Sequence, residues 1–75
     1  GPKVSQIQDQ LNAIAAVYSS IPTTNQDGTF TENTQHTVQA FQSLFGLPAS
    51  GIIDYPTWYK IQDIYVAVTR IAELT

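Results

Sequence analysis

The chain has 75 residues, of which 43% are hydrophobic and 12% are charged, so it is too apolar and too weakly charged to be disordered, and it is long enough for one small domain. Three dispersed cations against six acids give a formal net charge of −3, which excludes the clustered basic face that nucleic acid or an anionic membrane would require. The absence of cysteine excludes a disulfide scaffold, and no apolar run approaches the roughly 20 residues of a membrane-spanning helix.

The first predicted element is a helix over about residues 4–19. The preceding Gly1-Pro2 resembles the remnant of a cleaved expression tag, so residues 3–75 are expected to form the single domain. Pro22 is expected to end the helix, and the stretch "PTTNQDG" at 22–28 predicts a loop. Apolar residues recur at the spacing of one buried helical face: Val4, Ile7, Leu11, Ile14, Ala15 and Tyr18.

A second helix is predicted over residues 32–45. Thr31 is its expected N-cap, and Glu32 stands where the helix dipole favours a negative charge. Gly46 is expected to take the left-handed conformation after the last turn, and Pro48 prevents continuation. The predicted buried stripe is Val38, Phe41, Leu44 and Phe45.

A repeat precedes the second and third helices. The stretch "SGIIDYPT" at 50–57 has the layout of "DGTFTENT" at 27–34, 23 residues earlier. Each copy places a glycine, Gly28 or Gly51, in a turn that favours positive φ, and then an N-cap, Thr31 or Asp54. A third helix is predicted over residues 55–74, with the buried stripe Trp58, Ile61, Ile64, Tyr65, Val68, Ile71 and Ala72.

These elements predict an all-α fold, a small three-helix bundle with two repeated turn-helix units. In this interpretation Thr29-Phe30 and Ile52-Ile53 insert their side chains into the core, which gains burial from the turns themselves. The two extended segments are also free to pair as a two-residue bridge.

An ordered set of short motifs runs through most of the chain: Ile7-Gln8, Leu11, Asp27-Gly28-Thr29-Phe30, Thr34, Thr37-Val38, Phe41-Gln42, Gly46-Leu47, Gly51-Ile52-Ile53 and Thr57-Trp58. This set resembles the type 1 peptidoglycan-binding domain, a three-helix module attached to bacterial cell-wall hydrolases. Thr31 and Asp54 replace two turn glycines of that family, and Ser50 replaces an aspartate. The resemblance implies a non-catalytic module that binds peptidoglycan, through its glycan or its stem peptide.

The residues favour no catalytic site. His36 is the only histidine and is expected on the surface of the second helix, because a zinc site would need at least two more ligands. Asp27 and Asp54 are the acids of the two turns, and we interpret them as turn and cap residues rather than a hydrolytic pair. We therefore expect no enzyme activity, no cofactor and no metal.

Candidate ligand-binding residues are aromatic or uncharged polar. Aromatic rings offer apolar contact to sugars, and amides match the amides and hydroxyls of glycan and stem peptide. Trp58 is instead predicted to anchor the core. The predicted ligand-binding residues are Asp27, Asn33, Gln39, Gln42, Tyr55 and Tyr59.

Two hypotheses for function follow. The first is a monomeric, extracytoplasmic wall-binding module, a fragment of a larger cell-wall hydrolase or spore or wall protein, covalently linked to its other domains. The second is a protein-interaction or propeptide-like spacer that docks a neighbouring domain through the long third helix. Exposed apolar residues on that helix would favour the second hypothesis, and a polar groove with exposed tyrosines would favour the first.

Overall fold

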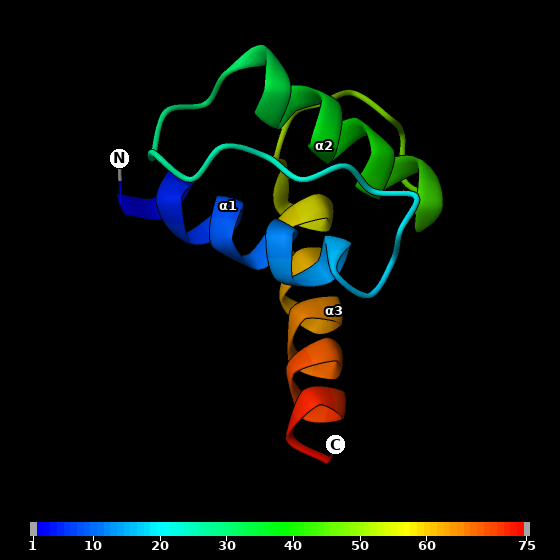
Figure 1. The fold of residues 1–75 in the computed structure, drawn as a ribbon. Helices are drawn as coiled ribbons and strands as arrows, with labels where there is room; N and C mark the ends of the chain where they lie inside the picture. The colour runs from blue at the N-terminus through cyan, green and yellow to red at the C-terminus, as the bar shows by residue number, and fades with distance from the viewer. Residues whose placement is uncertain (1, 75) are drawn as a thin grey trace.

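The computed structural model describes residues 2–74 and contains three helices: α1 at Pro2–Ala15, α2 at Glu32–Leu44 and α3 at Tyr55–Leu74. In Figure 1, α1 and α2 lie together at one end of the molecule, and α3 crosses behind α1 and extends well beyond it. Within residues 2–74 no strand or bridge forms, so the two turn segments do not pair with each other. The predicted all-α three-helix bundle is confirmed. Gly1, half of the predicted tag remnant, lies outside the described residues.

The core lies where α1 crosses the other two helices, and α1 packs more extensively on α3 than on α2. Phe45 and Trp58 are half-buried against this core, and the Phe41 and Phe45 ring centroids are 4.8 Å apart. The buried apolar residues are Ile7, Leu11, Ile14, Ala15, Ile21, Val38, Phe41, Ile61 and Val68.

Helix α1 ends four residues before the predicted boundary at residue 19. The Val17 amide donates to the Ile14 carbonyl at 3.0 Å, so the chain tightens into a three-residue turn before it reaches Pro22. The Ile21 amide then donates to the Tyr18 carbonyl, and Ile21 returns to the core with 3% of its surface exposed. Tyr18, predicted on the buried stripe, is exposed because it precedes this return.

Two other predicted core residues are exposed. Leu44 lies in the last turn of α2 with 44% of its surface exposed, and Ile71 lies on the end of α3 that α1 does not reach, with 54% exposed. Both continue a buried stripe past the point where a neighbouring helix covers it. The side chain of Ala72, predicted on the same stripe, lies outside the described residues.

The prediction that both turns insert their side chains into the core is wrong for three of the four residues. Thr29, Phe30 and Ile52 are exposed, and only Ile53 packs against the core. The reason is that the turn backbone faces inward: the Thr29 and Ile52 carbonyls accept hydrogen bonds from buried glutamine side chains. The side chains of Phe30 and Ile52 are consequently available on the surface.

Candidate functional site

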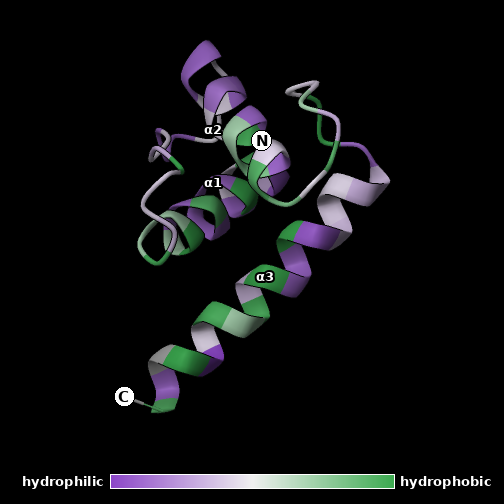
Figure 2. Cartoon of the chain, turned by 90° about the vertical axis from the view of Figure 1, so that its right-hand side faces the viewer, coloured by the Kyte–Doolittle hydropathy of each residue, from purple (hydrophilic) through white to green (hydrophobic). Residues whose placement is uncertain are grey.

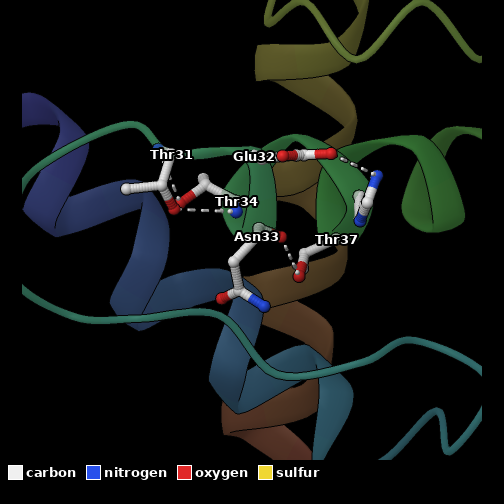
Figure 3. Close-up of polar contacts among 6 residues, drawn as sticks. Thr31, Glu32, Asn33, Thr34 and Thr37 are labelled. Atoms are coloured by element: carbon white, nitrogen blue, oxygen red, sulfur yellow. Dashed lines mark hydrogen bonds and ion pairs between the residues drawn. The ribbon is translucent and has the colours of Figure 1, made fainter.

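The starts of α2 and α3 are fixed by side-chain caps. The Thr31 hydroxyl accepts from the Thr34 amide at 3.4 Å, and the Thr34 hydroxyl accepts from the Thr31 amide at 3.5 Å, which forms a capping box (Figure 3). At the start of α3 the Asp54 carboxylate accepts from the Thr57 amide at 3.1 Å. The predicted N-caps, Thr31 and Asp54, are thus confirmed.

The turn before α2 is held by Gln8, a fully buried residue of α1. The Gln8 Oε1 atom accepts from the Gly28 amide at 2.9 Å, and Nε2 donates to the Thr29 carbonyl at 2.9 Å and to the Thr34 hydroxyl at 3.1 Å. One side chain therefore joins α1, the turn and the first turn of α2. Gly28 has a φ of 78°, as the sequence predicted.

The turn before α3 repeats this arrangement with Gln42 of α2, which is also fully buried. Its Oε1 atom accepts from the Gly51 amide at 2.9 Å, and Nε2 donates at 3.0 Å to both the Ile52 carbonyl and the Thr57 hydroxyl. Gly51 has a φ of 76°, again as predicted. Each copy of the sequence repeat therefore consists of a glycine turn and a helix start, and a buried glutamine from outside the copy holds it.

Gln42 was predicted to bind ligand, and its burial corrects that prediction. Because its amide makes four internal hydrogen bonds, to Gly51, Ile52, Thr57 and Ser50, and has no exposed surface, it holds the turn and presents no surface to a ligand. Gln8 was noted in the sequence only for its place in the family pattern. The available signal was that both glutamines follow a buried apolar residue, Ile7 or Phe41, and so lie on the edge of the core stripe.

Asp27 and Asn33 hold the loop that leads into α2. The Asp27 carboxylate accepts from the Thr29 amide at 3.0 Å and from the Asn25 side chain, and these bonds hold the pKa of Asp27 below its ordinary value. The Asn33 Oδ1 atom accepts from the Asn25 amide at 3.0 Å. In Figure 3 the Asn33 side chain points from α2 toward that loop. Both side chains are exposed but already partnered.

The two predicted tyrosines lie together on the first turns of α3. Tyr55 and Tyr59 are 77% and 65% exposed, and their rings stack with centroids 6.2 Å apart and an interplanar angle of 24°. Gln39 is half-buried near the second turn, where its Cγ would lie 3.2 Å from a Cβ added to Gly51. The predicted set is therefore divided between the loop, the second turn and the start of α3.

A groove of about 620 Å³ opens between the start of α1, both turns and α3. Its walls are mostly apolar, and Trp58 also lines a second hollow of about 190 Å³ beside Tyr55. The groove is lined by Lys3, Val4, Gln6, Ile7, Phe30, Gly51, Ile52, Ile53 and Trp58. The outward side chains of the two turns form part of its wall. The groove was not predicted from the sequence, because these side chains were expected to point into the core.

The titratable side chains of residues 2–74 are the remaining candidates for a catalytic or metal site. His36 and Glu32, one helical turn apart on α2, approach to 3.9 Å with both side chains largely exposed. Residues 2–74 contain no group of three or more histidine, aspartate or glutamate side chains arranged to hold a metal ion. Within the same residues, none of the helices is both long and apolar enough to cross a bilayer.

A comparison with protein families matches residues 1–61 to the putative peptidoglycan binding domain. Since the match covers most of the chain, the protein belongs to this family. The matched residues include α1, both repeated turns, α2 and the first part of α3. Comparison with curated proteins and with solved structures gives no significant match. The remaining residues of α3, 62–74, lie outside the family match.

Proposed function

We propose that this domain is a non-catalytic peptidoglycan-binding module and that its ligand lies in the groove between the two turns. The observation that carries the proposal is an apolar groove lined by Phe30, Ile52 and Trp58 in a member of this family. An apolar groove with a few polar residues at its edge is the usual form of a ligand site.

The groove suits the mixed chemistry of peptidoglycan. The rings of Trp58 and Phe30 offer apolar faces to sugar rings, acetamido methyl groups and small apolar side chains of the stem peptide. Lys3 and Gln6, from the first turns of α1, add an ammonium group for a peptide carboxylate and an amide for a hydroxyl or peptide group.

Tyr55 and Tyr59 extend this site along α3 in our proposal. Tyr55 shares the second hollow with Trp58, and the stacked, exposed pair of rings continues the aromatic surface past the groove. Asp27 and Asn33 support the loop of the first turn, and Gln39 lies beside the second. Of the residues predicted from the sequence, the two tyrosines are thereby assigned to ligand contact, and Asp27 and Asn33 to the geometry of the first turn.

The larger context of the proposal is tethering. One small groove supplies few contacts, so the isolated domain should bind weakly, and its benefit would come from raising the local concentration of a linked partner at the wall. We therefore infer an extracytoplasmic location and a covalent link to a cell-wall hydrolase or another spore or wall protein.

The test combines co-sedimentation with purified sacculi and fluorescence. Trp58 is the only tryptophan, so its emission reports directly on the groove when soluble muropeptides are titrated. Ile52→Asn should weaken binding about tenfold by removing an exposed apolar wall without a core contact. Val17→Asn is the matched control, because Val17 is similarly exposed, at 51% against 66% for Ile52, and lies away from the groove.

The proposal fails if the unmodified domain stays in the supernatant even when two copies are fused for avidity. In that outcome the docking-spacer function takes its place. The observation favouring this second candidate is the exposure of apolar residues on α3, which is 52% for Val66, 54% for Ile71 and 82% for Leu74.

A further inference from the structure

The end of α3 carries a face that no other part of the domain covers. Figure 1 and Figure 2 show α3 extending away from α1 and α2, with hydrophobic and hydrophilic residues interspersed along the projecting end. Ile61 and Val68 are buried toward the core, whereas Asp63, Val66 and Arg70 are exposed. At 3.6 residues per turn these three lie on the side of the helix opposite the core.

Two charges of opposite sign lie on this face. Asp63 and Arg70 are seven residues apart, so they lie two turns apart on the same line of the helix. Neither has an ion-pair partner within residues 2–74. The midpoint between them along the sequence lies between residues 66 and 67.

We propose that this face binds a second copy of the chain as an antiparallel helix pair, with the two-fold axis passing between Val66 and Ala67. In a symmetric pair, if residue i contacts residue j, then j contacts i. This register places Arg70 beside Asp63 of the partner subunit. The contact occurs twice, so each of these four charges faces an opposite charge.

The apolar residues fit the same register. Val66 lies opposite the partner's Ala67 at the centre, where a small side chain lets two helices approach closely. Val66 and Ala67 are both exposed. The same antiparallel symmetry thus brings apolar residues together at the centre and places each Asp63 beside an Arg70.

The shape of the domain leaves room for the pair. Because the core packs on the side of α3 that carries Ile61 and Val68, the two domain bodies would lie on the outer sides of the helix pair. They would also lie at opposite ends of it, so each groove stays open. A dimer would present two grooves and gain avidity for any polymeric ligand, although the pairing itself does not depend on that ligand.

The test is sedimentation equilibrium of the full chain from about 10 μM to about 1 mM, where a weak helix pair should become measurable. Arg70→Asp and Asp63→Arg each put like charges in contact and should weaken self-association about tenfold or more. Asp9→Arg makes the same charge change as Asp63→Arg, but on an exposed residue of α1, and should leave self-association unaltered. Helical circular dichroism and Tm should be retained in all three variants.

Mixing the two weakened variants separates charge pairing from damage to the fold. In an equimolar mixture of R70D and D63R, each acid again meets a cation, so a heterodimer should form with affinity near that of the parent. Because the chain has no cysteine, Asp63→Cys and Arg70→Cys should cross-link to each other on oxidation in preference to themselves. A parent that stays monomeric at about 1 mM, or a mixture that does not associate, would overturn the proposal.

Discussion

The turn before α2 and the turn before α3 are each held by a buried glutamine that makes the same set of hydrogen bonds. The two glutamines differ in how far along the chain they lie from the turn. Gln8 reaches Gly28 across 20 residues from another helix, whereas Gln42 reaches Gly51 across nine residues from the helix just completed. The first contact fixes tertiary structure, and the second is nearly local. In both cases a buried glutamine holds the turn backbone before the helix start, whatever the length of the intervening loop.

The longer first loop needs additional support, which the second turn lacks. The Asn12 side chain donates to the Thr24 carbonyl at 2.9 Å and accepts from the Thr24 amide at 2.8 Å. Asn25 accepts from the Thr31 and Thr34 hydroxyls at 2.9 Å each. The extra residues of the first loop are therefore tied to α1 and to the α2 cap, which limits the freedom that a long loop would otherwise have.

Truncation of a core side chain should lower the free energy of unfolding most, and the losses caused by changes in the two turns can be compared with it. Phe41 is fully buried and directly precedes Gln42, so Phe41→Ala should lower the free energy of unfolding by about 3 to 5 kcal/mol, enough to unfold a domain of this size. Thermal and urea denaturation followed by circular dichroism would measure it. A variant that melts within a few degrees of the parent would contradict the assignment of Phe41 to the core.

Removal of each glutamine tests the comparison directly. Gln8→Leu and Gln42→Leu each remove the hydrogen bonds that the glutamine makes to a turn amide, a turn carbonyl and a threonine hydroxyl, and should cost about 2 to 4 kcal/mol. Gln42→Leu should cost more, because Gly51 is buried and Gly28 is half-buried. Gln26→Leu, at an exposed loop position, is the control and should change stability by less than about 0.5 kcal/mol. Equal losses in all three variants would show that neither turn depends on its glutamine.

The glycines should give the next largest effect. Gly46 and Gly51 share a φ of 76°, but an added Cβ meets nothing within 4 Å at Gly46 and approaches Gln35 Cγ to 2.7 Å at Gly51. Gly46→Ala should therefore cost about 1 kcal/mol from backbone strain alone, and Gly51→Ala more than that. The difference in unfolding free energy isolates the close approach at the second turn. If the two losses are equal, Gln35 moves aside without cost.

Local rules of the sequence predicted the helix starts and the turns. Thr31 and Asp54 act as N-caps, and Gly28 and Gly51 take positive φ, because each depends on backbone geometry within a few residues. Features that depend on distant partners were missed. The end of α1 is set by the return of Ile21 to the core, which no pattern within the helix reveals.

The candidate site was harder to predict than the fold for a related reason. A buried glutamine that holds a turn and an exposed glutamine that contacts a ligand look alike in a sequence, and Gln42 was assigned to the wrong group. Once the turn backbones face inward, Phe30 and Ile52 must face out, and the groove forms between them and Trp58. The groove is therefore a consequence of the polar contacts inside the molecule, which an apolar pattern does not encode.

The smallest expected effect is on stability in acid. The two turns differ in where they place an acid and where they place a hydroxyl, and this difference allows a test. The first turn has an acid in the turn, Asp27, and a hydroxyl at the cap, Thr31. The second has a hydroxyl in the turn, Ser50, whose Oγ accepts from the Ile52 amide at 3.1 Å, and an acid at the cap, Asp54. Each unit therefore contains one titratable acceptor.

The stability of both units should fall in acid. Hydrogen bonds from the Thr29 amide lower the pKa of Asp27, and those from the Thr57 hydroxyl and amide lower the pKa of Asp54. A carboxyl whose pKa is lower in the folded state stabilises the fold above its unfolded pKa. That contribution is lost as the pH falls from about 4 through the folded value. Asp27→Ser and Asp54→Thr, each copied from the other unit, should each flatten the dependence of Tm on pH between about 6 and 2, and the double variant should flatten it most. An unchanged slope in the double variant would mean that neither carboxylate couples folding to protons.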